Sequence, residues 1–284
     1  AGRTLDTITR EVINGGSNVQ YGEGQVTGRH LLVGGEAAGN HYFTVRAVRK
    51  AVRFLKTMNA PRYEGSYWAI IHPDCSYDIQ DDPDWKRPHE YKDTSNIYDD
   101  EIGKIAGVRF IETTEAKVFH ADDLTEGARD LTVKSASSKV LTVNEAITTA
   151  DAAKLAGREV VIGGALLEIE SATAAGAGSA TITLKEAPAA TPTASTTIYP
   201  GEAGAKGRNV YSTLIMGAEA YGTTELTGGG LEHIVKPLGS AGTADPLNQR
   251  ATVGWKATKV AERLVEAYMI RVETTSTFDE TPLT

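Results

Sequence analysis

The sequence predicts an α+β protein in which a small all-β domain interrupts a larger mixed domain. Outside residues 122–208, apolar residues recur at helical spacing or form short runs that are typical of buried strands. Inside that segment the chain is rich in Ala, Thr, Ser and Gly, lacks Trp, Phe and Met, and places its apolar residues in short bursts between turn signals. The length of 284 residues allows one large or two modest domains.

The first half of the chain predicts helices and strands in alternation. Residues 5–13 are amphipathic and are stopped by Asn14-Gly15-Gly16, so they read as the end of a helix, and we expect an N-terminal part to be missing before it. Apolar residues at steps of three or four predict a helix over 42–55, which ends before Pro61. The apolar run 67–71 predicts a buried strand.

The next segment predicts a short helix, a loop and further strands. Asp74 is the expected N-cap of a helix that runs through Ile79. Residues 81–88 are polar and contain two prolines, so we expect a loop with room for one helical turn. Residues 108–113 predict a second strand, and the apolar pair at 118–119 follows it.

The second half predicts the inserted module and the return of the parent domain. Residues 131–133, 140–143, 159–162, 166–169 and 180–184 are the β-like bursts. A strand is expected at 210–216 and a shorter one at 231–235. A discontinuous parent domain with a β insertion is the simplest account, because insertions are tolerated where chain ends lie close together.

The C-terminal run from Gly239 to Glu273 is ambiguous. Its apolar residues from Val253 to Met269 fit helical spacing, yet residues 267–272 alternate as a strand does. Periodicity alone leaves both possibilities open.

Composition narrows the function. The net charge of −8 argues against a nucleic-acid binder that relies on a basic surface, although a local basic patch is conceivable. Such a patch is formed by cations of the predicted helix at 42–55, which we expect to be a solvated face: Arg46, Arg49, Lys50, Arg53 and Lys56. The single cysteine forms no intrachain disulfide, and neither a signal peptide nor an apolar run of the ~20 residues that cross a bilayer is visible.

Few side chains suggest chemistry. His72 and Cys75 could be a base and a nucleophile, but without an orienting third group a buried structural cysteine is favoured. The histidines form no metal-binding motif; they are His30, His41, His72, His89, His120 and His233. We therefore predict no catalytic residue, no metal ligand and no cofactor, and do not expect an enzyme.

Two other patterns resemble binding motifs without completing them. The acidic cluster of Asp78, Asp81, Asp82 and Asp84 lacks the glycine of a calcium loop, so helix capping and surface ion pairs, with Lys86 and Arg87 as partners, are favoured. The glycine-rich segments 22–28, 201–207 and 228–230 lack the spacing of phosphate-binding loops and are expected to be turns.

Long strings of the sequence resemble one family, the major capsid proteins of tailed bacteriophages and prophages, in its podovirus-type branch. The resemblance covers most of the chain outside the insert. The strings that carry it are LDTITREVINGG, RHLLVGG, YWAIIHPDCSYDIQDDPDW, EIGKIAGVRFIETTEAKVFHAD, NVYSTLIMGAEAYGTTEL and GGGLEHIVKPLGSAGTADPLNQRATVGWKATKVAERLVEAYMIRVE.

This resemblance implies the Hong Kong 97-type capsid fold, with the N-terminal arm and extended loop of that fold lying before Ala1. It implies the following divisions: residues 1–40, the end of the spine helix and a Gly-rich connection; 41–121 and 209–238, the two parts of the axial domain; 122–208, the inserted β domain on the outer surface; and 239–284, strands of the peripheral domain and the C-terminus. For the ambiguous C-terminal run it favours strands.

The implied function is mechanical: many copies would form hexamers and pentamers of an icosahedral shell around double-stranded DNA. The partners would be other copies, then portal, scaffold, maturation protease and non-specifically held DNA, with no membrane. The location would be the virion, after assembly in the bacterial host cytoplasm. Without the arm, this chain alone is expected to form monomers or small oligomers. The alternatives are an encapsulin-like shell and a surface- or carbohydrate-binding module carried by the β insert.

Overall fold

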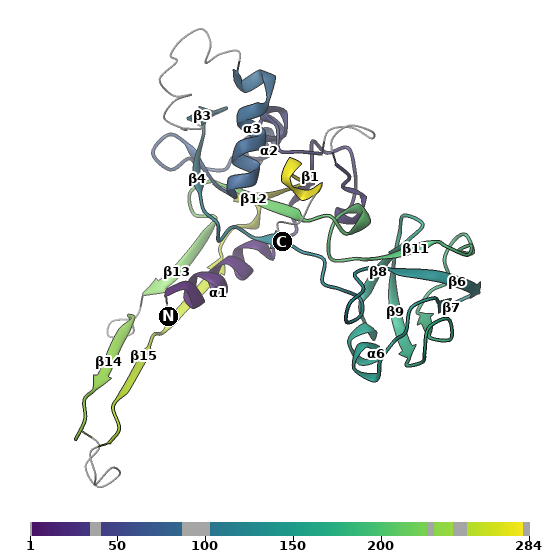
Figure 1. Ribbon diagram of the computed structural model, residues 1–284. Coiled ribbons are helices and arrows are strands. Elements are labelled where there is room, and N and C mark those ends of the chain that lie inside the picture. The colour runs from purple at the N-terminus through teal and green to yellow at the C-terminus, as the bar shows by residue number, and fades with distance from the viewer. Residues whose placement is uncertain (1, 35–40, 87–102, 226–229, 241–248, 281–284) are drawn as a thin grey trace.

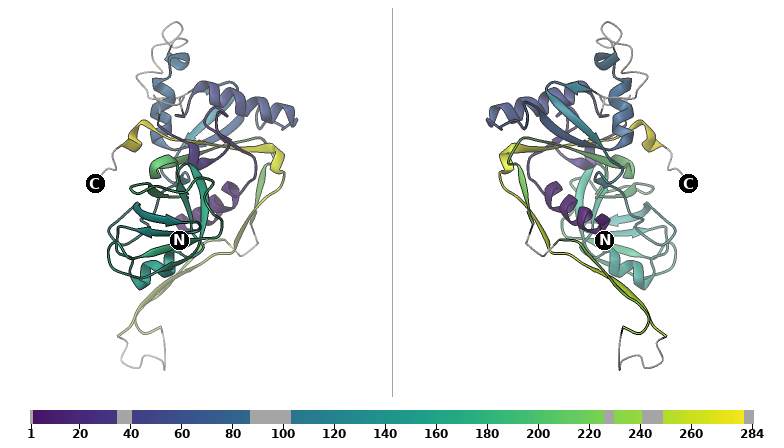
Figure 2. Two further views of the ribbon diagram at one scale, coloured as in Figure 1. Left: turned by 90° about the vertical axis from the view of Figure 1, so that its right-hand side faces the viewer. Right: turned by 90° about the vertical axis from the view of Figure 1, so that its left-hand side faces the viewer.

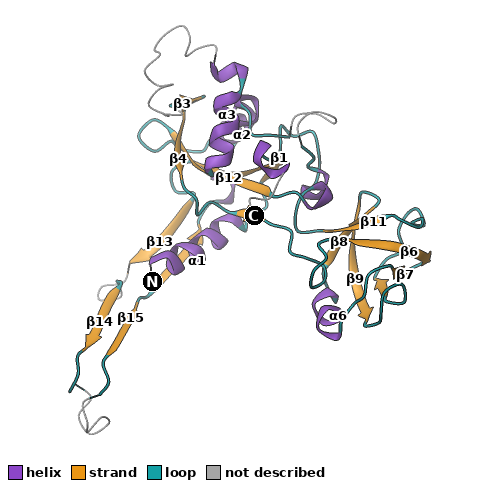
Figure 3. Ribbon diagram, viewed as in Figure 1, coloured by secondary structure: helices purple, strands orange, loops and turns teal. Residues whose placement is uncertain are grey.

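The computed structural model describes residues 2–34, 41–86, 103–225, 230–240 and 249–280. It consists of a mixed sheet with helices, a closed β-barrel and a long two-stranded ribbon (Figure 1). The barrel and the ribbon leave the sheet on different sides, and the side views in Figure 2 show the ribbon as the part that reaches furthest from it. Figure 3 shows that most of the helical turns lie near the sheet.

The central sheet combines segments from both halves of the chain. Its strands, in spatial order, are β1 (Val19–Tyr21), β17 (Met269–Thr274), β12 (Val210–Met216), β2 (Tyr67–Ile71), β4 (Val108–Glu112) and β3 (Lys104–Ile105). A seventh strand, β5 (Val118–Phe119), also pairs with β12. The pairs β1–β17 and β2–β4 are parallel, whereas β12 is antiparallel to β17 and β2, and β3 is antiparallel to β4. The predicted strands at 67–71, 108–113 and 210–216 are therefore confirmed.

Helix α2 (Val45–Thr57) lies on one face of this sheet, and its N-terminus is capped twice. The Thr44 side chain accepts a hydrogen bond from the Ala47 N–H at 3.2 Å, and Asp82 accepts one from the Val45 N–H at 2.9 Å. These two acceptors satisfy donors that a helix leaves free in its first turn. The helix is confirmed, but it begins after the cap, so Tyr42 lies outside it.

Helix α3 (Pro73–Asp81) is confirmed with a different N-cap from the predicted one. His72 is the cap, because its Nδ1 accepts a hydrogen bond from the Asp74 N–H at 3.3 Å. Proline occupies the first helical position, where its missing N–H costs nothing, and this moves the helix start ahead of Asp74. The loop after Asp81 does contain a helical turn, since the N–H groups of Trp85 and Lys86 both donate to the Asp82 carbonyl.

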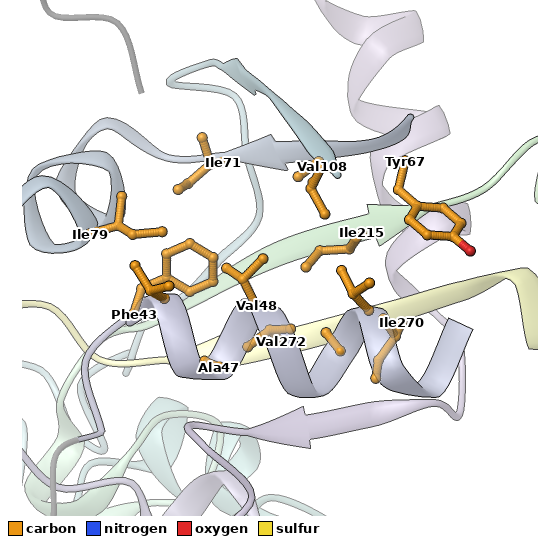
Figure 4. Packing of buried hydrophobic residues seen from close by; sticks show 14 of the residues in the cluster. Phe43, Ala47, Val48, Tyr67, Ile71, Ile79, Val108, Ile215, Ile270 and Val272 are labelled. Atoms are coloured by element: carbon orange, nitrogen blue, oxygen red, sulfur yellow. The ribbon is translucent and has the colours of Figure 1, made fainter. Parts of the chain in front are cut away.

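The main core lies between α2, α3 and the sheet (Figure 4). Val48 and Val52 of α2 belong to one buried cluster with Ile215 of β12 and Val272 of β17. The rings of Phe43 and Phe110 meet edge to face, with their centroids 6.4 Å apart. Each fully buried side chain of this size stabilises the fold by about 1.5–3 kcal/mol relative to exposure. The alternating burial of β2, with Tyr67, Ala69 and Ile71 buried, follows from this one-sided contact.

Helix α1 (Gly2–Asn14) covers part of the opposite sheet face. Ile13 packs there with Leu214, Met216 and Met269. The helix ends at Asn14, as predicted, and the Gly15 N–H donates to the Val12 carbonyl. α1 also lies along the ribbon (Figure 1), where Lys259 approaches Asp6 at 3.7 Å.

Residues 131–200 form a closed barrel with its own core. Its strands are β6 (Leu131–Ser137), β7 (Val140–Val143), β8 (Glu159–Ile162), β9 (Ala165–Thr173), β10 (Thr181–Leu184) and β11 (Thr197–Pro200). Side chains such as Leu131, Leu141, Ile169 and Ile182 fill the interior and are fully buried. The predicted β bursts are confirmed.

Sequence reasoning missed helix α6 (Thr149–Leu155) in the barrel. Thr148 and Asp151 form a reciprocal capping box at its start. That box, followed by Gly157 just beyond the helix, was the available signal.

The C-terminal run resolves as strands, so the helical interpretation of its spacing is wrong. β15 (Thr252–Lys256) pairs with β14 (Glu232–Lys236), and β16 (Lys259–Arg263) pairs with β13 (Tyr221–Glu225). These pairs form the ribbon, and β17 then returns to the central sheet. By strand pairing, β13 and β14 belong with the ribbon, and β17 belongs with the central sheet. The limits 209–238 and 239–284 stay a prediction.

Candidate functional site

The residues that suggested a nucleophile and its base are engaged within the fold. Cys75 is fully buried and its Sγ lies 3.7 Å from Oγ1 of Thr274, and burial raises the pKa of its thiol far above the usual range. His72 caps α3, and its ring centroid lies 5.0 Å from that of Tyr211. Burial lowers the pKa of His72. A thiol that is buried and held protonated is a poor nucleophile, so the interpretation as a buried cysteine is confirmed.

The acidic cluster is used for capping and ion pairing. Asp82 caps α2, and Asp81 forms an ion pair with Lys86. Asp78 is buried and accepts a hydrogen bond from the Thr277 hydroxyl at 2.6 Å, while desolvation raises its pKa. Asp84 lies 3.9 Å from Arg49, and Arg87 lies outside the described residues. The expected capping and ion pairs are thus present.

The cations of α2 lie on its exposed side. Arg46 approaches Glu23 at 3.4 Å, and Lys50 donates to the Glu23 carbonyl. Arg53 and Lys56 border a shallow hollow next to Ala106. Exposed pairs of this kind contribute less than about 1 kcal/mol each, in keeping with the expected solvated face.

The glycine-rich segments lie in turns where the structure describes them. Gly22 and Gly24 have positive φ values of 54° and 79° at the end of β1. The segment 201–207 connects the barrel to the sheet, and residues 228–229 lie outside the described residues.

The remaining histidines lie in separate parts of the molecule. His30 belongs to the segment after β1, His41 is buried beside the end of β17, His120 follows β5 and His233 lies in the ribbon. His89 lies outside the described residues. Over the ranges that the structure describes, no group of three His, Cys, Asp or Glu side chains is arranged to hold a metal ion.

A buried ion cluster joins distant segments, and sequence reasoning did not anticipate it. Glu273 of β17 is fully buried and accepts two hydrogen bonds from Arg29, each at 2.8 Å. Arg271 Nε lies 2.7 Å from the same carboxylate, and the Arg29 guanidinium stacks over the Phe119 ring at 3.4 Å. The partners are 244 residues apart, so no local pattern could reveal the pair.

The ribbon exposes an apolar face. Cross-strand partners share a face, and the pairs Val235–Val253 and His233–Trp255 lie on the same one. Val253 is 71% exposed and Trp255 is 48% exposed. An isolated pair of strands is marginally stable in water, and exposed apolar patches mark contact surfaces. The alternation of Val253, Gly254 and Trp255 was the sequence signal for this surface.

A hollow of about 260 Å³ lies between α1 and the sheet. Apolar residues such as Ile13, Ile70 and Leu214 line it together with the cations Arg10 and Lys117. Lys117 is paired with Glu11 at 2.7 Å.

No helix within the described ranges is long and apolar enough to span a membrane.

The molecule is thus extended, its candidate nucleophile is buried, and its acidic cluster caps a helix and forms ion pairs. Comparison with protein families matches residues 4–225 to the family described as phage capsid protein. The chain belongs to this phage capsid protein family. A search of curated proteins finds no significant match.

Solved capsid structures also resemble the chain. The capsid of the cyanophage P-SCSP1u matches with a TM-score of 0.48 and 12% identity, covering 97% of this chain and 62% of that one. The acidic stable capsid of the Helicobacter pylori bacteriophage KHP30 matches with a TM-score of 0.47 and 8% identity over 96% and 65%. The head of the Helicobacter pylori bacteriophage KHP40 matches with a TM-score of 0.44 and 10% identity over 96% and 65%. The chain thus spans 62–65% of the length of these capsid chains.

Proposed function

We propose that this chain forms the shell of an icosahedral bacteriophage capsid, in which hexamers and pentamers of it enclose double-stranded DNA. Membership of the phage capsid protein family over residues 4–225 carries the proposal. The exposed apolar face of the ribbon supports it, because a subunit of a closed shell has contacts with its neighbours that cover such surfaces.

We propose the Hong Kong 97-type fold for the subunit. In that assignment α1 is the end of the spine helix, the central sheet with α2 and α3 is the axial domain, and the ribbon is the peripheral domain. The barrel is an inserted domain on the outer surface. Strand pairing supports the division, since the ribbon strands β13 to β16 pair only among themselves in the described part of the chain.

The acidic character of the chain suits a container for DNA. With a net charge of −8, the wall repels a packaged polyanion and holds it only weakly, which leaves the DNA free to move during filling. The partners that we propose are further copies of the chain, a portal, a scaffold, a maturation protease and the packaged DNA. The proposed location is the virion, after assembly in the host cytoplasm, and the proposed role is not enzymatic.

Family membership favours this proposal over the alternatives. An encapsulin-like shell has the same kind of fold, but the match is to phage capsid proteins. A carbohydrate-binding module centred on the barrel would need aromatic side chains on which sugars can stack. Residues 122–208 contain Tyr199 but no Trp.

Electron microscopy of the expressed full-length protein tests the proposal. Closed particles or curved hexameric sheets are expected, and a monodisperse monomer under all assembly conditions would refute it. The double variant Val253→Ser and Trp255→Ser should reduce assembly, because it removes apolar area from the ribbon. Lys236→Ser, on the other face of the same ribbon, is the matched control and should assemble normally.

A further inference from the structure

Two short irregular segments connect the barrel to the central sheet. The first, residues 120–123, follows β5 (Val118–Phe119), and the second, residues 201–209, precedes β12. β5 and β12 pair with each other, and His120 Nδ1 lies 3.1 Å from Asn209 Oδ1, so the two segments start side by side. Domains joined in this way move relative to each other unless contacts between them prevent it.

From the barrel side, Arg158 contacts both connecting segments. Its guanidinium donates to the Asp123 carbonyl at 2.9 Å and to the Asp122 carbonyl at 2.5 Å on the first segment. On the second segment, its Nε donates to Glu202 Oε1 at 2.6 Å. The Arg158 side chain is only 13% exposed, whereas the side chain of Glu202 is 42% exposed.

From the sheet side, Arg29 contacts the second segment and β5, the strand that directly precedes the first segment. Its Nη1 donates to the Glu202 carbonyl at 3.3 Å on the second segment. Its guanidinium stacks over Phe119 of β5, and its other nitrogens bind the buried carboxylate of Glu273. Glu202 is therefore the meeting point: its side chain binds Arg158 and its backbone binds Arg29.

Backbone contacts support the same arrangement. The Ala205 N–H donates to the Leu32 carbonyl at 2.9 Å, which ties the second segment to the chain beside Arg29. The Gly201 N–H donates to the Glu159 carbonyl at 2.9 Å, and a Cβ at Gly201 would come within 2.7 Å of the Glu159 backbone. Only glycine permits this approach.

We propose that Arg158, Glu202 and Arg29 form a clamp that holds the barrel in one orientation relative to the sheet, and that the barrel reorients about the two connecting segments when the clamp is released. Charge-assisted hydrogen bonds from a planar guanidinium fix the direction of the partner as well as its distance, so they can hold the barrel in one orientation. This device is independent of shell formation, because all of its contacts lie within one chain.

Distance measurements between two spin labels test the clamp. One label is placed on the barrel by Ser171→Cys and the other on α2 by Lys56→Cys, both exposed positions, while the native Cys75 is buried and stays unlabelled. With the clamp intact we expect a single narrow distance distribution. Arg158→Met keeps most of the apolar stem but removes the donors, and should broaden the distribution or shift its maximum.

The matched control is Lys185→Met, which removes the exposed Lys185–Glu168 ion pair on the barrel, a pair that includes none of the three clamp residues. It should leave the distribution narrow. Glu202→Ala is the second test variant, in case Arg158→Met fails to fold, and circular dichroism with the thermal midpoint confirms that each variant is folded. A folded Arg158→Met or Glu202→Ala protein with an unchanged distribution would overturn the clamp, as would equal broadening in the Lys185→Met control.

Discussion

Replacing Glu273 by Gln should destabilise the sheet, because it leaves Arg29 and Arg271 around a neutral side chain. Glu273 is fully buried, whereas Arg29 and Arg271 retain 23% and 11% exposure, so water compensates only part of the loss. Breaking a buried ion pair costs about 3–5 kcal/mol, and the residual exposure places this case near the lower end, about 3 kcal/mol. For a chain of this size that corresponds to a fall of roughly 6–12 °C in Tm.

Tryptophan fluorescence during urea or thermal unfolding measures this effect selectively. The chain has three tryptophans and none lies in residues 122–208, so the signal reports the sheet and ribbon and not the barrel. Lys185→Gln, which breaks an exposed ion pair on the barrel, should leave the fluorescence transition in place. A Glu273→Gln protein whose unfolding free energy lies within about 1 kcal/mol of the unaltered protein would refute the assigned role of the buried carboxylate.

Three further predictions concern other parts of the molecule. Cys75 should resist a thiol reagent in the native protein and react in urea, because it is fully buried and its pKa is raised; rapid native labelling would contradict this. Asp78→Asn should be at least as stable as the unaltered protein at neutral pH, because burial raises the pKa of the Asp78 carboxyl. Ionisation of this carboxyl therefore costs stability as the pH rises from the ordinary carboxyl range through the raised pKa. Urea midpoints at several pH values should show the stability difference between the two proteins shrinking on acidification, and a constant difference would argue against it. Residues 122–208 expressed alone should unfold cooperatively, and Ile182→Ala should lower their unfolding free energy by about 2–5 kcal/mol in denaturant titrations, whereas a disordered fragment would show that the barrel core depends on the sheet.

Local patterns predicted the elements that depend on one apolar face. The spacing of Val45, Val48, Val52 and Leu55 predicted α2, because those side chains form the stripe that packs on the sheet. The β bursts predicted the barrel strands for the same reason. The C-terminal run could not be resolved from its spacing, because its ribbon strands bury few side chains and its apolar residues follow no single period.

The clusters of interacting side chains were harder to predict from the sequence than the helices and strands. The structural roles of Cys75 and of the acidic residues could be inferred from what their motifs lacked. The Arg29–Glu273 pair and the clamp could not be inferred, because they depend on which distant segments the fold brings together. Helix α6 was missed although its capping box was present, because the surrounding β-like composition outweighed a seven-residue signal.

Because β5 pairs with β12, the chain leaves and re-enters the central sheet at neighbouring positions, and the barrel could be replaced by another domain. Val118–Phe119 and Val210–Tyr211 are hydrogen-bonded neighbours, so a short turn could close the gap between them, and another compact domain with adjacent termini could be spliced in at the same place. The sheet and its core would keep all of their strands. A change of the inserted domain would therefore leave the packing of the sheet as it is.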